Sequence, residues 1–209
     1  YAGSSRMPSN DKYRLFPAAS LGWVISKEGF LKGSNVVNFL KLRAGYGIVG
    51  MDRYLSYDMD KQFNQAGGSY IFQNKDWLGG LMQGAIPSTN IMPETDYKAD
   101  LGVEFGMFDN SLMFQLEGFY NNRKNIACNG SETVSEVLGV GVPIIFTGET
   151  VNYGAELSAT WRKTIGDFTY SIGGNVSYSK NRIVEAAEGH VPYEWQRIAG
   201  TQIGEMYGY

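Results

Sequence analysis

Cysteine and histidine are nearly absent from this chain of 209 residues, because Cys128 is the only cysteine and His190 the only histidine. One cysteine permits no intrachain disulfide and no multi-cysteine metal site. One histidine leaves little material for a zinc site or a Ser–His–Asp triad. The sequence also offers no pair of catalytic carboxylates and no phosphate-binding loop. We therefore expect a protein that is not an enzyme and that holds no metal and no cofactor.

Long hydrophobic runs and an excess of positive charge are missing as well. No stretch approaches the roughly 20 apolar residues of a transmembrane helix, and residues 1–14 contain no apolar segment typical of a signal peptide. The net charge is −3 and lysine and arginine are not clustered, which argues against a nucleic-acid surface. A membrane role would therefore have to come from β-strands.

Glycine and aromatic residues are abundant instead. The chain contains 27 glycines, 14 tyrosines and 11 phenylalanines, and 43% of its residues are hydrophobic while 19% are charged. Tyrosine and phenylalanine favour strands, and the hydrophobic content is too high for a disordered chain. This composition favours an all-β fold.

Strict alternation of apolar and polar residues is the clearest pattern. In residues 151–163, VNYGAELSATWRK, the odd positions are apolar up to the tryptophan and the even positions are mostly polar. Such alternation predicts a strand with one apolar face. Five further segments show the same pattern, namely 15–23, 40–48, 97–107, 112–120 and 169–179. Most of the six span about nine to eleven residues, the length of a tilted membrane strand rather than the ~5–6 typical of soluble proteins.

The connections alternate between short and long. Residues 108–111 (FDNS) and 164–167 (TIGD) predict tight turns, whereas 49–96, 124–150 and everything after Lys180 are expected to be long loops. The link 24–38 is intermediate, with a short helical turn expected at 26–32. Short turns at one end and long loops at the other are typical of outer-membrane barrels, although a soluble β-sandwich could also have unequal loops.

Aromatic residues fall near both ends of the apolar faces. If the tight turns lie on the periplasmic side, the outer end carries Tyr46, Tyr97, Tyr120, Tyr153 and Tyr178, and the inner end carries Trp23, Trp161 and Tyr170. Tyr153 and Trp161 are eight residues apart, or about 20 Å along the membrane normal at a tilt of ~40°, close to the ~25 Å apolar band of a barrel. The spacing predicts that these aromatic residues lie at the membrane interfaces. In a sandwich the same apolar face would instead pack into a protein core.

Three further aromatic residues lie close together in a predicted outer loop. The stretch YIFQNKDW contains Tyr70, Phe72 and Trp77, and aromatic rings there could pack against sugar rings of a substrate. The alternative, which the sequence favours, is that they fix the loop to the rim of the barrel.

Several stretches resemble the SusC/RagA-type TonB-dependent outer-membrane transporters of Bacteroidetes. The similar segments are LFPAASLGWVISKEGF (15–30), FLKLRAGYGIVG (39–50), TGETVNYGAELSATWRK followed by FTYSIGGNVSYSKNRI, and the closing GEMYGY. The resemblance covers most of residues 13–209, and it is carried by segments outside the loops 51–92 and 124–146, which are expected to be the most variable parts.

This resemblance implies a 22-stranded transmembrane β-barrel with antiparallel up-and-down strands. Residues 1–209 would form a partial barrel domain from its later part, without the plug, the signal peptide or the barrel C-terminus. It further implies import of oligosaccharides or peptides across the outer membrane, energised through TonB and assisted by a SusD-like surface lipoprotein. The alternatives are a soluble extracellular sandwich that binds carbohydrate and a passive porin or adhesin barrel.

Overall fold

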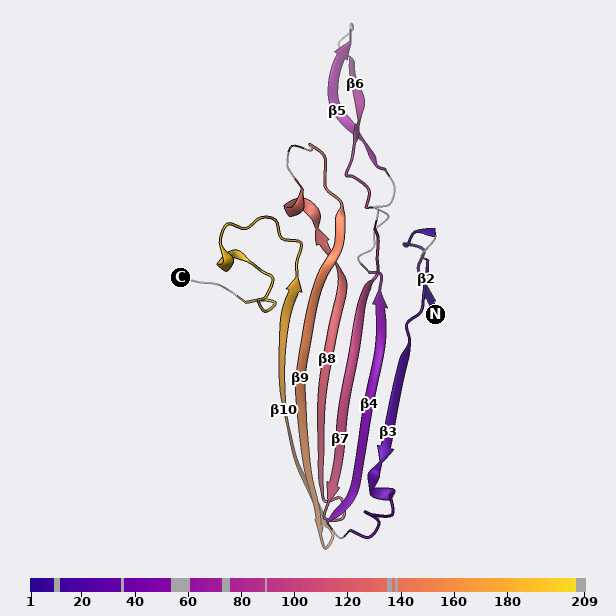
Figure 1. Ribbon diagram of the computed structural model, residues 1–209, viewed down its shortest axis with the longest axis vertical. Helices are drawn as coiled ribbons and strands as arrows, with labels where there is room; N and C mark the ends of the chain where they lie inside the picture. The colour runs from indigo at the N-terminus through magenta and orange to yellow at the C-terminus, as the bar shows by residue number, and fades with distance from the viewer. Residues whose placement is uncertain are drawn as a thin grey trace.

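A single antiparallel sheet of six strands dominates the computed structural model, which describes residues 1–9, 12–34, 36–53, 61–72, 76–88, 90–134, 137 and 139–205. The strands are β3 (Ala18–Val24), β4 (Val37–Met51), β7 (Glu94–Met107), β8 (Leu112–Asn129), β9 (Ile144–Ile165) and β10 (Phe168–Glu185). Their order in the sheet is β10–β9–β8–β7–β4–β3, and every neighbouring pair is antiparallel. The prediction of six antiparallel up-and-down strands is confirmed (Figure 1).

Several strands are longer than the alternation predicts. β8 has 18 residues and β9 has 22, so much of 124–150, expected to be a loop, belongs to strands. The reason is a pair of β-bulges. The β8–β9 register shifts between Arg123 and Ile126, where Asn125 adopts a φ of 57°, and it shifts back between Ile126 and Ala127. A bulge inserts an extra residue and reverses which face the following side chains occupy. The strand therefore continues although its simple alternation stops. Cys128 accordingly lies in β8 rather than in a loop, where its thiol is not part of a disulfide and donates to Ile126 O at 3.4 Å.

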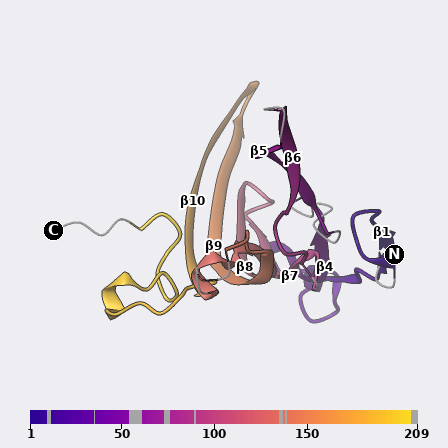
Figure 2. The same ribbon diagram turned by 90° about the horizontal axis from the view of Figure 1, so that it is seen from above.

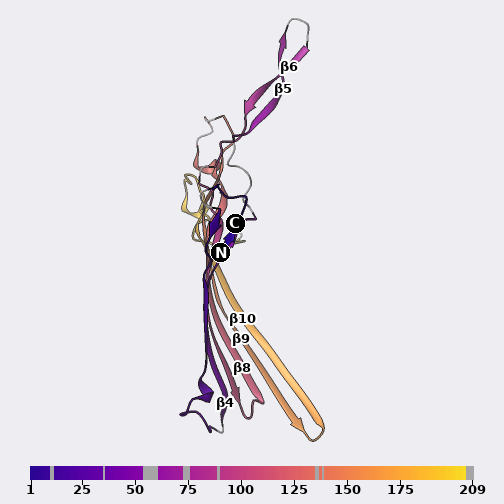
Figure 3. The same cartoon turned by 90° about the vertical axis from the view of Figure 1, so that its right-hand side faces the viewer.

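A hairpin interrupts the long connection 49–96, which was expected to be a loop. Its strands are β5 (Phe63–Phe72) and β6 (Asp76–Gln83), and within the described part of the chain they pair only with each other. The hairpin projects beyond the loop end of the main sheet (Figures 1 and 3). Sequence alternation misses it because FNQAGGSYIF mixes polar residues and glycines on both parities.

The tight turns lie together at the end of the sheet opposite the hairpin (Figure 1). Three consecutive residues, Phe108 to Asn110, adopt φ values of 52–59° in the β7–β8 turn, and Gly166 adopts 59° in the β9–β10 turn. The β3–β4 link contains a short 3₁₀ turn, Ile25–Lys27, where a helical turn is expected. Within the described segments, no helix is both long and apolar enough to cross a membrane.

The main sheet has no hydrophobic core of its own. Among the described residues the buried hydrophobic side chains are Met7 and Ile91, which pack with the partly buried Phe146 near the loop end. The two other sheets described, β5–β6 and β1 (Ala2–Gly3) with β2 (Tyr13–Arg14), have two strands each and do not cover the large sheet. A β-sandwich requires a second sheet packed face to face. The sandwich alternative is therefore wrong for the part of the chain described here.

The sheet is curved and twisted rather than flat. Seen from above, β4, β7, β8 and β9 follow an arc (Figure 2), and towards the tight turns the β9–β10 hairpin leans away from β4 (Figure 3). Such coiling follows from the right-handed twist of the individual strands. The alternation of side chains along each strand gives the sheet two faces, and these carry the predicted membrane-interface residues.

Candidate functional site

Tyrosines line up across strands near the loop end of the apolar face. The register pairs Ala99 with both Tyr46 and Tyr120, and Tyr120 with Tyr153, so that these residues form one row across four strands. Tyr97 lies two residues further outward on β7, and Tyr178 lies opposite Ala155, two residues further inward. Tyr46, Tyr120, Tyr153 and Tyr178 expose 42–64% of their surface. Tyrosine has an apolar ring and a polar hydroxyl, a combination that suits a boundary between apolar and aqueous surroundings.

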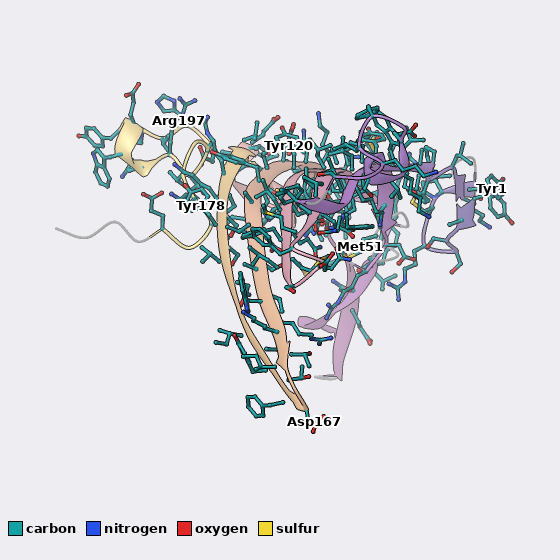
Figure 4. All side chains as sticks on the ribbon, turned by 90° about the horizontal axis from the view of Figure 1, so that it is seen from below. Tyr1, Met51, Tyr120, Asp167, Tyr178 and Arg197 are labelled. Atoms are coloured by element: carbon teal, nitrogen blue, oxygen red, sulfur yellow. The ribbon has the colours of Figure 1, made fainter. Side chains whose placement is uncertain are left out.

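The aromatic residues predicted for the inner end lie near the tight turns. Trp161 pairs with Leu112, the first residue of β8, and Tyr170 pairs with Lys163 close to the β9–β10 turn. The indole N–H of Trp23 donates a hydrogen bond of 3.0 Å to Glu28 Oε1 in the β3–β4 link. In Figure 4, Tyr120 and Tyr178 lie well away from Asp167, which marks the β9–β10 turn. The membrane-interface role of all eight aromatic residues stays a prediction.

Aliphatic side chains fill the face between these two aromatic levels. One row runs across five strands through Leu42, Val103, Leu116, Leu157 and Val176. Leu116, Leu157 and Val176 expose 49%, 43% and 71% of their surface. Exposed apolar area on this scale marks an interaction surface, because soluble monomers rarely leave large contiguous apolar patches in water.

The opposite face carries a network of charges in the middle of the sheet. Arg43 of β4 crosses β7 and contacts Glu117 of β8, and its Nε lies 3.8 Å from Glu104 Oε1. Lys41 Nζ lies 3.2 Å from the same Glu104 oxygen. These four side chains are 26–34% exposed. A second group nearer the loop end joins Arg123 to Glu94 at 3.2 Å and to Asp96 at 3.7 Å. The polar face is therefore linked across strands by ion pairs.

Glycine makes room for these charged side chains. A Cβ atom at Gly102 would lie 2.5 Å from Arg43 Nε, and a Cβ atom at Gly45 would lie 2.5 Å from an Asp100 carboxylate oxygen. Both glycines belong to the polar parity of their strands, next to the charged residues in the register. Sequence reasoning assigned the charges to this face, but only the register shows which glycines they cross.

Removing Arg43 is expected to weaken the sheet. In Arg43→Met, Glu104 and Glu117 lose a shared cation while staying half-buried, so we expect the free energy of unfolding to fall by about 1–2 kcal/mol. Urea unfolding of the full-length protein in lipid vesicles measures this difference. Lys98→Met is the matched control, since Lys98 is 50% exposed and, among the described residues, has Asp96 as its one acidic partner, and it is expected to cost less than about 0.5 kcal/mol. Equal losses in the two variants would contradict the network.

The three predicted substrate-contact residues lie on the projecting hairpin. Tyr70 pairs with Leu78, Phe72 with Asp76 and Trp77 with Ile71, so the three are neighbours along the hairpin but none is directly opposite another. Their side chains lie outside the described part of the chain. Their contact with a substrate stays a prediction.

A further aromatic pair escaped the sequence analysis. Tyr193 and Trp195 stack at a centroid distance of 5.8 Å and an interplanar angle of 14° in the segment after β10, and both are more than half exposed. This segment folds back beside β10, because Gly200 N donates to Ile183 O at 2.7 Å and Ile183 N donates to Thr201 O at 2.8 Å. In the sequence, the pair could have been found from two aromatic residues two positions apart in PYEWQ.

Similar proteins are found among curated sequences and solved structures. The chain is 30% identical to TonB-dependent receptor P3 of Formosa agariphila over 99% of its length and 27% identical to TonB-dependent receptor SusC of Bacteroides thetaiotaomicron over 90%. It spans about a fifth of those relatives, 22% and 19% of their lengths. Its fold is similar to a structure of the RagAB peptide importer in an open-open state, with a TM-score of 0.73, 18% identity, and coverage of 87% of this chain and 19% of that one.

The family assignment rests on a match that covers nearly the whole chain. Residues 2–203 match the family described as TonB dependent receptor-like, beta-barrel. The match includes all six strands of the main sheet and the hairpin β5–β6. The resemblance to SusC/RagA-type receptors is thereby confirmed: this chain belongs to the TonB-dependent receptor β-barrel family.

Proposed function

We propose that residues 1–209 form part of the wall of an active outer-membrane importer of oligosaccharides or peptides that is energised through TonB. The observation that carries the proposal is the exposed aliphatic band between two levels of aromatic residues, with ion-paired charges on the opposite face. An apolar outside bordered by aromatic girdles and a polar inside are the two faces of a membrane barrel. The apolar face therefore contacts lipid, and the polar face contacts the lumen or a plug inside it.

The open edges of the sheet support a larger barrel. β3 and β10 each have one neighbour within the described sheet, and an unpaired strand edge is too costly in hydrocarbon, where no water satisfies its backbone groups. Six strands are also fewer than the eight of the smallest closed barrels. The relatives are about five times as long as this chain, which leaves room for further strands. We propose that these strands close a barrel of 22 strands and that this chain belongs to its later part.

The substrate and the partners are proposed from the relatives. From the resemblance to SusC/RagA-type receptors, we propose that a SusD-like surface lipoprotein covers the loop end and that TonB supplies energy from the inner membrane. A passive porin would need neither, and membership of the TonB-dependent receptor family argues against it. The barrel has no catalytic task in this scheme.

Uptake by living cells tests the function directly. The full-length gene is deleted and restored in its host, and uptake of fluorescently labelled oligosaccharides and of labelled peptides is compared with and without a protonophore. We expect one of the two classes to enter only with the gene and only in energised cells. Uptake that persists at full rate with the protonophore would indicate a passive barrel and overturn the proposal.

The hairpin aromatics give a sharper test of substrate contact. In Tyr70→Ala/Phe72→Ala/Trp77→Ala, we expect uptake at low substrate concentration to fall at least about tenfold, since each lost ring contact weakens binding by about 0.5–1.5 kcal/mol. The amount of barrel in the outer membrane should stay unchanged. Phe63→Ala is the control, because Phe63 is 62% exposed at the base of the same hairpin. Unchanged uptake in the triple variant would assign these residues to anchoring the loop.

A further inference from the structure

An open groove of about 760 Å³ lies on the apolar face at the level of the tyrosines. Small residues form its floor: Gly118 pairs directly with Ala155, and Ala99 lies one step further outward. Large side chains border it, with Leu101 on one side, Tyr178 on the other, and Tyr120 and Tyr153 at its outer end. A groove between large apolar walls with a floor of glycine and alanine fits a thin, flexible, unbranched hydrocarbon chain.

Two cations follow directly outward from this groove on the same face. Lys180 pairs with Tyr153 and Arg182 pairs with Val151, so both share the parity of Tyr178 on β10. They lie two and four residues beyond Tyr178, about 7 and 13 Å along the strand. Both are exposed, and neither has an acidic partner within 4 Å among the residues that the structure describes. Glu149, the next acidic residue outward on this face of β9, is paired with Lys124 at 3.4 Å.

We propose that this groove and these two cations form a binding site for one phosphorylated, acylated glycolipid of the outer leaflet. An acyl chain would lie on Gly118 and Ala155 between Leu101 and Tyr178, and a phosphate group would meet Lys180 and Arg182. Charge complementarity selects this ligand, because an uncharged lipid would leave both cations without a partner at the depth where headgroups begin. The inference rests on the proposed function, since it requires the apolar face to contact lipid.

The fold permits variants that separate the two halves of the site. Among the described residues, a Cβ atom at Gly118 would meet only the Gly154 carbonyl oxygen at 3.9 Å, so a larger side chain can start into the groove there, and we expect Gly118→Leu to fill it. Gly174→Leu is its control. Gly174 lies on the apolar face, on β10, outside the groove, and none of the described atoms lies within 4 Å of a Cβ atom added there. Lys180→Gln/Arg182→Gln removes the cations. Lys163→Gln removes a cation at the opposite end of the same face.

The experiment uses the full-length protein, purified in detergent and titrated with lipid A before and after enzymatic removal of its phosphates. Bound lipid is counted by native mass spectrometry. We expect Lys180→Gln/Arg182→Gln to weaken binding of the phosphorylated lipid at least tenfold and to leave the dephosphorylated lipid unaffected. Gly118→Leu should weaken the binding of both lipids. The controls Gly174→Leu and Lys163→Gln should weaken the binding of neither. If the parent protein and all four variants bind the same amount of each lipid, the lipid is bound nonspecifically and the proposal is overturned.

Failure of this inference is distinguishable from failure of the proposed function. Outer-membrane fractionation and the uptake assay are repeated with the same variants. If the protein is located in the outer membrane and imports its substrate, but binds the phosphorylated and dephosphorylated lipids equally, only the proposed lipid site is wrong. If the protein is absent from the outer membrane, the proposed function fails first.

Discussion

Replacing Leu157 with arginine is expected to prevent most of the full-length protein from assembling in the outer membrane. Leu157 lies halfway between Tyr153 and Trp161 on the apolar face and is 43% exposed. An arginine facing lipid near the bilayer midplane costs a barrel about 2–4 kcal/mol. The measurement is the amount of heat-modifiable barrel in purified outer membranes, together with urea unfolding of the protein refolded into vesicles.

The neighbouring position provides the control for this variant. Ser158 has the opposite parity and lies on the polar face, between Gln115 and Asn175 in the register. Ser158→Arg places the same charge one residue away but on the side that we assign to the lumen, so assembly should stay within about twofold of the parent protein. Equal losses in Leu157→Arg and Ser158→Arg would mean that the apolar face does not contact lipid.

Gly154→Ala is expected to lower the free energy of unfolding by about 1–3 kcal/mol, the usual cost of overpacking. A Cβ atom at Gly154 would overlap the backbone oxygen of Tyr178 and would lie 2.7 Å from Phe119 Cζ. The backbone of β10 cannot yield without disturbing its pairing with β9, whereas the Phe119 ring could rotate. Urea unfolding in vesicles, monitored by tryptophan fluorescence, measures the loss.

Gly174→Ala separates this clash from the general effect of replacing a strand glycine. Nothing lies within 4 Å of a Cβ atom at Gly174, so the substitution should be neutral or stabilise by up to about 0.5–1 kcal/mol through reduced chain entropy. Gly154→Ala as stable as Gly174→Ala would contradict the close β9–β10 approach. If Gly154→Ala lowers the free energy of unfolding by the same amount in a Phe119→Ala background as in the parent protein, the clash lies with the backbone of β10.

The two groups of predictions concern different parts of the proposed mechanism. The Leu157 variant tests whether the apolar face of the sheet contacts lipid. The Gly154 variant tests how closely β9 and β10 approach each other. The Tyr70, Phe72 and Trp77 variants ask whether the projecting hairpin recognises a substrate. A transporter wall that assembles normally but loses uptake in the hairpin variant would separate recognition from assembly.

The sequence alone determined the fold class and the assignment of side chains to two faces. Alternation with a period of two is a direct consequence of strand geometry, so VNYGAELSATWRK and its counterparts identified the six strands of the main sheet and their apolar parity without tertiary information. The tight turns at 108–111 and 164–167 were equally readable, because Asp109, Asn110 and Gly166 are residues that tolerate positive φ. Family resemblance could be read from the same strands, since their motifs occur in order.

Only the tertiary structure decided which residues meet across strands. The β8–β9 register shifts at Asn125 and shifts back between Ile126 and Ala127, and no alternation pattern reveals where such a pair of bulges lies. The approach of Arg43 to Glu117 across Gly102, the row of Tyr46, Tyr120 and Tyr153, and the groove over Gly118 all depend on the register. Register depends on pairing between distant segments, and local periodicity is identical for every even shift of one strand against its neighbour.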